Sequence, residues 1–318
     1  MKLEGLEHYH TKEWMSPSAL SNCARCPRRY FYSNGCRLAE KKTYPAMKFG
    51  EAIHAGLGCL FEGEGGGGRD TLPLDNAMHA FDRIWTREYQ DENPDPKRNT
   101  NRALQIFRHF HANHTVNRSL YTPVSPSGIG TEVANRVSPF EIAFAVDVGC
   151  DLPLVGRIDM LGRHNHTGEL WGIEFKTTSE LSARFVSGFE LSPQVLCYSL
   201  ALQLASHQRI AGVIIEALLV AKVSVDSLIL PVFVREHSFE DTISWIHWIR
   251  RRIKECEDSG DWPKDISACN PYSQFGQSGY TCDFQRLCLV DDWRSLKDTY
   301  VVLPEHRFLL TKDQGCEQ

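Results

Sequence analysis

The chain has 318 residues, of which 42% are hydrophobic and 24% are charged, and its formal net charge is −5 at pH 7. These values are typical of a globular protein with a substantial core, and no stretch is apolar for long enough to span a bilayer. The first residues lack the apolar core of a signal peptide, so we expect an intracellular, cytoplasmic protein, or one of the host cytoplasm if a phage encodes it. The negative charge argues against a protein that coats nucleic acids in general, but not against an enzyme that binds DNA through a local basic groove.

The N-terminal part of the chain is predicted to be helical. Ser16 suits a helix cap and Pro17 suits a first helical position. Further along, apolar residues recur at helical spacing until four consecutive glycines break the pattern. The expected helical stretches are residues 16–32, 46–62 and about 75–116, the last with a break at residues 93–96. Residues 121–130 are rich in Pro, Ser and Gly and are predicted to be a loop.

The C-terminal part alternates between strand and helix patterns. The predicted strands are residues 137–148, 154–161, 170–177, 213–220 and 229–234. A helix with Ser192 as its cap is expected to run to about His207, and another is expected over residues 239–256, before an irregular tail that contains cysteines. This order of elements indicates an α/β core in which helices flank the strands.

Two carboxylates and a lysine stand out in the predicted strands. Asp159 lies in one strand, and Glu174 and Lys176 lie in the next, where alternation puts them on one face while Phe175 points to the other. Two carboxylates and a backbone carbonyl favour Mg²⁺ or Mn²⁺, and a neighbouring ammonium can orient water and balance phosphate charge. The alternative is a surface hairpin with a cross-strand ion pair. The apolar strand context favours a site, because unpaired charge there is costly.

The chain resembles a known family through an ordered set of short motifs. In chain order, they are residues 16–30, 49–54, 156–159, 174–178 and 194–198. This order resembles RecB-like nucleases of the PD-(D/E)xK superfamily, which include CRISPR-associated iron-sulfur exonucleases and related phage recombination nucleases. The resemblance covers roughly residues 16–62 and 130–290.

The resemblance implies roles for individual residues. Asp159, Glu174 and Lys176 would be catalytic, and His54 would join the two carboxylates and the Phe175 carbonyl as a metal ligand. An additional acidic ligand is expected before the Asp159 strand, for which Glu132 is preferred over Glu141. Other residues are expected to bind DNA, and these are Gln194 and Tyr198 in one helix and Arg28 and Arg29 near the N-terminus.

The eleven cysteines are many for an intracellular chain, in which disulfides are not expected. The resemblance implies that one N-terminal and three C-terminal thiolates hold a [4Fe–4S] cluster, with structural Zn²⁺ as the alternative. The predicted ligands are Cys26, Cys269, Cys282 and Cys288. Cys23 competes with Cys26, and Cys269 departs from the usual spacing, in which a cysteine would replace Gly279.

The expected fold is therefore an α/β, restriction-endonuclease-like core, a mixed central sheet flanked by helices, with a helical insertion and a cysteine-stapled subdomain formed by both ends of the chain. The segments of this single nuclease unit are expected to be N-terminal helices over residues 1–62, the insertion over 63–130, the nuclease core over 131–256 and a cysteine-bearing segment over 257–318.

The expected function is metal-dependent hydrolysis of DNA, as an exonuclease on single strands or DNA ends in recombination, repair or CRISPR adaptation. The alternatives are a structure-specific endonuclease and a catalytically silent DNA-binding scaffold. No Walker A sequence is present, so a helicase motor would be a separate partner chain, and a recombination or CRISPR-adaptation protein is another candidate partner. No membrane partner is expected.

Overall fold

The structure is a computed structural model that describes residues 12–41, 44–65, 73–117, 120–124, 140–269, 282–290 and 293–304. The described residues fall into two compact units. Unit 1 is drawn from Met1–Thr43, Asp147–Val155 and Glu240–Phe308, and unit 2 from Tyr44–Val146 and Gly156–Phe239. Each unit therefore combines segments that are far apart in the sequence.

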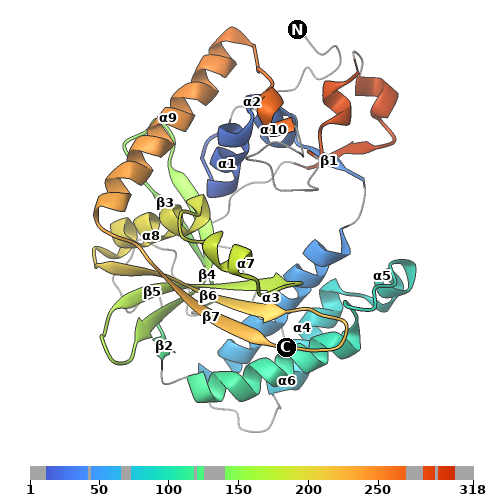
Figure 1. The fold of residues 1–318 in the computed structure, drawn as a ribbon, viewed down its shortest axis with the longest axis vertical. Helices are drawn as coiled ribbons and strands as arrows, with labels where there is room; N and C mark the ends of the chain where they lie inside the picture. The colour runs from blue at the N-terminus through green and yellow to red at the C-terminus, as the bar shows by residue number, and fades with distance from the viewer. Residues whose placement is uncertain are drawn as a thin grey trace. The chain divides into compact units, whose positions relative to one another are not determined.

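Unit 2 is built on a mixed β-sheet with strand order β2-β4-β5-β6-β7, in which β3 also pairs with β4 (Figure 1). The strands are β2 (Tyr121–Pro123), β3 (Phe140–Val146), β4 (Leu154–His164), β5 (Leu170–Thr178), β6 (Ile210–Leu219) and β7 (Ser227–Phe233). The β4–β5 and β6–β7 pairs are antiparallel, whereas β5 and β6 run parallel. All five predicted strands are present, with bounds that differ by a few residues; of the first, residues 137–139 lie outside the described residues.

Helix α8 (Pro193–Ser206) connects the parallel strands β5 and β6. A parallel pair needs such a crossover, because a short turn can join only antiparallel neighbours. Ser192 takes the N-cap position as predicted, but its side chain makes no capping hydrogen bond. The helix is buried over most of its surface, with Val195, Leu200 and Leu202 among its buried residues. α8 therefore forms part of the core as well as a connection.

A layer of helices packs on the sheet face to which Phe175 points. These helices are α3 (Pro45–Gly65), α4 (Pro73–Ile84), α5 (Arg87–Glu92) and α6 (Thr100–Asn117). Their apolar residues form one buried cluster with the strands, in which Phe175 lies 5.7 Å from Phe110 and 5.9 Å from Phe140 between ring centroids. The helical stretches predicted over residues 46–62 and 75–116 are confirmed, with the expected break at residues 93–96 and a further break between α4 and α5. Helices flank a mixed sheet as expected.

Unit 1 begins with α1 (Pro17–Arg25), α2 (Pro27–Tyr30) and a short π-helix, η1 (Phe31–Gly35). Ser16 caps α1 through a 3.2 Å bond from the Ala19 N–H, as predicted. The single helix expected over residues 16–32 is wrong, because the chain is extended at Cys26, with φ −166° and ψ 119°. Pro27 explains the break, since a proline disfavours helical geometry in the residue before it.

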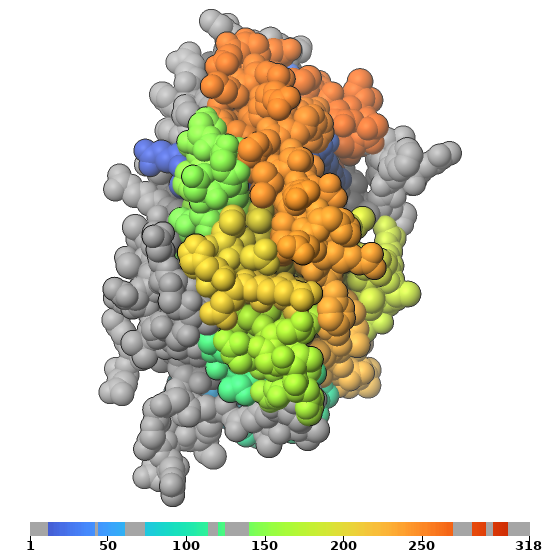
Figure 2. Space-filling view, turned by 90° about the vertical axis from the view of Figure 1, so that its left-hand side faces the viewer, coloured from blue at the N-terminus to red at the C-terminus, as the bar shows by residue number. Residues whose placement is uncertain are grey.

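The remaining elements of unit 1 come from the C-terminal part of the chain. Strand β1 (Leu38–Glu40) pairs antiparallel with β8 (Tyr300–Val302), and the short elements α10 (Ile266–Cys269), η3 (Arg286–Cys288) and η4 (Trp293–Leu296) lie between α9 and β8 in sequence. Helix α9 (His237–Ser259), orange in Figure 2, is exposed along one side. The sequence did not predict the β1–β8 pair, because each strand has three residues and its partner is distant in the chain.

Helix α9 is fastened to residues 147–153 by charged contacts within unit 1. Arg250 donates two 2.8 Å hydrogen bonds to Asp151 and one of 3.0 Å to Glu257. The His247 Nε2 atom lies 2.7 Å from the Val148 carbonyl oxygen. Arg250 belongs to a basic run in the sequence, yet it is buried and satisfied by two carboxylates. It serves here as a structural cation.

Two further predictions need correction. The first part of the loop expected over residues 121–130 forms β2, an edge strand on β4, and Tyr121 is buried there. A strand of three residues that contains a proline has little sequence signal, and prolines within sheets favour such edges. Cys59 is disulfide-bonded, contrary to the expectation that the chain has no disulfides.

Among the described residues, no helix is both long and apolar enough to cross a membrane.

Candidate active site

The paired strands β4 and β5 bring Asp159 and Glu174 together. The antiparallel ladder ends with Met160 opposite Ile173. Beyond it, the Asp159 side chain accepts a 2.7 Å hydrogen bond from the Phe175 N–H. Both carboxylates are buried, at 6% and 5% exposure, and each acts electrostatically on the other.

The two oxygens of the Glu174 carboxylate differ in their hydrogen bonds. Its Oε1 accepts from Lys176 Nζ at 2.5 Å and from Gln194 Nε2 at 2.7 Å. Its Oε2 is buried and has no hydrogen-bond partner among the described residues. Burial and the Asp159 charge raise the pKa of Glu174 to about 7, although Lys176 opposes them. A buried oxygen without a partner is costly in an apolar interior, so its position indicates a ligand.

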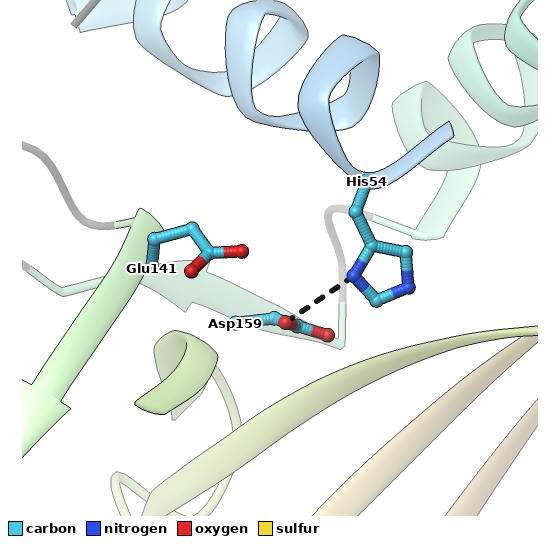
Figure 3. Close-up of side chains that lie close together, drawn as sticks. All are labelled: His54, Glu141 and Asp159. Carbon is cyan, nitrogen blue, oxygen red and sulfur yellow. Dashed lines mark ion pairs between the residues drawn. The ribbon is translucent and has the colours of Figure 1, made fainter. Parts of the chain in front are cut away.

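His54 and Glu141 complete a group around Asp159 (Figure 3). One possible ligand atom from each of the three side chains lies within 4.8 Å of the others. His54 comes from α3, and its Nδ1 is 3.4 Å from Asp159 Oδ1. Burial acts to lower the pKa of His54, but the charge and hydrogen bond of Asp159, together with Glu174, raise it. The neighbouring negative charges thus outweigh desolvation.

Glu141 has an unusual backbone conformation at the start of β3. Its φ is 58°, in the left-handed region that residues other than glycine rarely adopt. Such strain persists where the surrounding structure fixes it, and it clusters at functional sites. Glu141 was the second choice for the additional acidic ligand, and the structure places it beside His54 and Asp159. The preferred residue, Glu132, lies outside the described residues.

Gln194 and Tyr198 lie one helical turn apart on α8 and share a face, as predicted. Gln194 Nε2 donates to the Tyr198 hydroxyl at 3.2 Å as well as to Glu174. Tyr198 is 9% exposed and packs its ring against Phe144 at 5.6 Å. This pair therefore acts on the carboxylate of Glu174, which sequence reasoning did not foresee. Its expected role in positioning DNA stays a prediction.

The donor set fits a small divalent cation. Carboxylate oxygens suit Mg²⁺ and Mn²⁺, and an imidazole is compatible with Mn²⁺ in particular. Glu174 Oε2 and the group of His54, Glu141 and Asp159 supply such donors from α3, β3, β4 and β5. The Phe175 carbonyl stays a predicted ligand; its side chain points away, into the apolar cluster. The sequence motifs assigned no role to Arg157, although it lies two residues before Asp159 and therefore on the same face of the strand.

A second candidate site lies in unit 1, where electrostatic effects relate the four predicted cysteines, although no three of their sulfur atoms lie within 4.8 Å of one another. Burial raises the pKa of Cys269, and the charges of Cys26 and Cys282 raise it further. Burial also raises the pKa of Cys288, with Lys264 opposing and Cys269 and Cys26 adding to it. Cys26 therefore lies near the C-terminal thiols. Its rival Cys23 lies near Arg252 and Cys256, and burial raises its pKa to about 12.

Two of these cysteines accept hydrogen bonds. The Asp265 N–H donates to Cys26 Sγ at 3.3 Å, and Arg29 Nη1 donates to Cys282 Sγ at 3.6 Å. Arg28 Nη1 is buried without a hydrogen-bond partner among the described residues, and the Arg28 charge acts on Cys288. These hydrogen-bond donors and the buried cation would stabilise anionic sulfur atoms, and thiolates are the form of cysteine that binds a cluster or a metal.

The same contacts do not support a DNA-lining role for Arg28 and Arg29. Arg28 is 7% exposed and donates through Nε to the Trp262 carbonyl. Arg29 forms a 3.2 Å ion pair with Asp283. Tertiary packing thus uses both guanidinium groups inside unit 1, which the sequence alone did not indicate.

Comparisons with known proteins address the family. The model of the PD-(D/E)XK nuclease superfamily matches residues 14–288. No curated protein matches the sequence. Among solved structures, the chain is similar to a "Putative exonuclease" from Eubacterium rectale, with 12% identity, 88% of this chain and 94% of that chain covered, and a TM-score of 0.47. It is also similar to the protein SSO0001, with 14% identity, 90% of each chain covered and a TM-score of 0.31. Since the family match spans most of its length, the chain belongs to the PD-(D/E)XK nuclease superfamily.

Proposed function

We propose that the protein is a divalent-metal-dependent DNA nuclease, and that it acts as an exonuclease on single strands or strand ends. The observation that carries the proposal is the buried Oε2 of Glu174, which has no hydrogen-bond partner in the part of the chain that the structure describes. Glu174 lies on β5, next to the strand that carries Asp159 of the group with His54 and Glu141. Membership of a nuclease superfamily supports hydrolysis of phosphodiesters. The preference for single strands or ends rests on the ordered motifs alone.

The proposed ligands are His54, Asp159 and Glu174, with Glu141 as the acidic residue added by β3. A divalent cation held there supplies positive charge for the phosphate and lowers the pKa of water. The Lys176 ammonium is fixed against Glu174 Oε1, beside the place where a phosphate would be attacked. Lys176 would orient the attacking water and balance the charge that develops on the phosphate. Gln194 holds the Glu174 carboxylate in the same orientation.

The thiols of Cys26, Cys269, Cys282 and Cys288 are the proposed ligands of a [4Fe–4S] cluster, with a structural Zn²⁺ as the alternative. Such a group would join residues that are more than two hundred positions apart in the chain, and closing so long a loop restricts the unfolded state. Its role in this proposal is structural. Partner proteins and the biological pathway, whether recombination, repair or CRISPR adaptation, follow only from the resemblance.

The test is cleavage of end-labelled linear single-stranded DNA with Mg²⁺ or Mn²⁺. Lys176→Ala and Asp159→Asn should each reduce the rate about 10²- to 10⁴-fold, because they remove a charge that acts on the reacting phosphate or its metal. Lys222→Ala, at an exposed lysine of unit 2, is the matched control and should cleave at the wild-type rate. Equal rates for wild type and Lys176→Ala would contradict the proposal and favour a silent DNA-binding scaffold.

Circular single-stranded DNA distinguishes the two nuclease classes. An exonuclease should leave the circle intact while it degrades the linear form of the same sequence. Cleavage of the circle would instead support the endonuclease alternative, and would leave the metal-dependent chemistry in place.

A further inference from the structure

Arg157 lies on β4 beside the candidate metal ligands, and the proposed chemistry gives it no role. It precedes Asp159 by two residues, so alternation along the strand puts both side chains on the same face. Its Nε is 3.6 Å from Glu141 Oε2, and 27% of its side chain is exposed. A guanidinium group therefore lies at the edge of the group formed by His54, Glu141 and Asp159.

The contact between Arg157 and Glu141 lacks the geometry of a structural ion pair. A separation of 3.6 Å is too long for a hydrogen bond, and Arg157 Nε is buried without a hydrogen-bond partner among the described residues. Arg250 in unit 1 shows how this chain builds a structural pair, with two 2.8 Å bonds to the oxygens of Asp151. Arg157 makes no such pair of bonds to any residue that the structure describes, and a buried donor that stays unpaired is costly.

The position of Arg157 matches the needs of a phosphate. The Glu141 carboxylate lies near both the Arg157 guanidinium and the other candidate ligands. When that carboxylate binds a cation, the N–H groups of Arg157 remain available to donate to another anion. A planar guanidinium pairs with phosphate oxygens through two parallel bonds, and it keeps its charge at any physiological pH. The exposed part of the side chain gives an incoming anion access.

We infer that Arg157 is a substrate-binding residue that contacts a backbone phosphate of the DNA next to the candidate metal site. This inference rests on the proposed nuclease function and adds to it a residue that the motif pattern does not assign. The bond is a charge-assisted hydrogen bond between the guanidinium and a phosphate oxygen. No covalent step is assigned to Arg157.

The salt dependence of DNA binding tests the inference without turnover. Each phosphate contact to single-stranded DNA contributes about 0.7 to the slope of log affinity against log salt concentration. With a fluorescent single-stranded oligonucleotide and Ca²⁺ as the cation, Arg157→Ala should make this negative slope shallower by about 0.7 and lower the affinity by roughly tenfold to a hundredfold. Arg157→Lys, which keeps the charge, should keep the slope and lose part of the affinity.

Arg163 provides a matched control on the same strand. It lies six residues further along β4, where its Nη1 donates to the Gly168 carbonyl oxygen at 2.8 Å in the β4–β5 turn. Arg163→Ala should leave the slope and the affinity unchanged. Mn²⁺ affinity, measured by titration without DNA, should not fall in Arg157→Ala, because the variant removes only a cation that competes for Glu141.

Other outcomes overturn the inference. If Arg157→Ala keeps the wild-type slope, or loses Mn²⁺ affinity with an unchanged slope, Arg157 only holds Glu141 in place and the inference fails while the nuclease proposal stands. Arg157→Gln gives the same test if the alanine variant does not fold. If the wild-type protein neither cleaves nor binds the oligonucleotide, the proposed function itself fails, and the inference fails with it.

Discussion

Gln194 and Glu174 are joined by a 2.7 Å hydrogen bond from Nε2 to Oε1, across the space between α8 and β5. The same oxygen accepts from Lys176, so both donors act on one side of the carboxylate. The other oxygen, Oε2, is left without a partner among the described residues. The amide of Gln194 therefore fixes which oxygen of Glu174 is available to a ligand.

Gln194→Ala should weaken the site without removing a ligand. Loss of the bond frees the Glu174 carboxylate to rotate, and such supporting contacts are worth about 10- to 100-fold in metal affinity or activity. We expect Mn²⁺ affinity and the cleavage rate to fall within that range, as measured by titration and by initial rates. Gln208→Ala, beyond the end of α8, is the control. A Gln194→Ala variant with normal Mn²⁺ affinity and a normal rate would show that Lys176 alone fixes the carboxylate.

The choice between Glu141 and Glu132 as the additional acidic ligand leads to a second prediction. Glu141→Gln should lower Mn²⁺ affinity at least tenfold, because an amide oxygen carries no charge for the cation. Glu169→Gln, at a partly exposed residue of the β4–β5 turn, should leave the affinity unchanged. The variants are compared by Mn²⁺ titration without DNA. A large loss in Glu132→Gln together with none in Glu141→Gln would reverse the assignment.

The third prediction concerns the thiols of unit 1. After purification without air, the wild-type protein should contain iron and show visible absorbance, because four thiolates suit a [4Fe–4S] cluster. Cys269→Ser should lose most of the iron, whereas Cys150→Ser, at a free cysteine whose thiol lies near Asp151 and Arg250, should retain it. Metal analysis decides the outcome. A colourless protein with bound zinc would contradict the cluster and leave a structural zinc site in its place.

Much of the central site could be predicted, because strand alternation is a local property. Asp159, Glu174 and Lys176 lie on two neighbouring apolar strands, as their spacing predicted, and the Asp159 charge acts on Glu174. Their catalytic roles stay a prediction. His54 required the family resemblance, since a histidine on a helix carries no such signal. The structure then places its imidazole 3.4 Å from Asp159.

Other features depend on tertiary contacts that a sequence pattern does not encode. The positive φ of Glu141 and the burial of Arg28 arise from packing. Neither could enter the choice between Glu132 and Glu141 or the expectation that Arg28 binds DNA. Strand β2 forms by pairing with β4, a contact that is distant in the sequence. The break at Cys26 was the exception, because the following Pro27 is a local signal that the helical prediction did not use.

Glu216 on β6 provides a test of the fold that is independent of the active site. It lies opposite Phe175 in the parallel β5–β6 register, and therefore on the face away from Glu174 and Lys176. Its carboxyl group is 6% exposed and accepts a hydrogen bond from the Tyr121 hydroxyl. Burial raises the pKa of Glu216 to about 7 from an ordinary value of 4.5, although the bond from Tyr121 opposes the shift.

The raised pKa predicts how stability depends on pH. Between pH 4.5 and about 7 the folded protein binds a proton at Glu216 that the unfolded chain does not, so this contribution is fully present below pH 4.5 and is lost as the pH rises through about 7. Glu216→Gln cannot ionise, so at pH 8 it should exceed the wild type in free energy of unfolding by roughly 3 kcal/mol, with little difference at pH 4.5. Denaturant titrations at the two pH values measure this difference.

Tyr121→Phe should move this loss of stability to higher pH, because it removes a hydrogen bond that favours the charged form of Glu216. A difference between wild type and Glu216→Gln that is the same at both pH values would mean that Glu216 ionises normally in the folded protein.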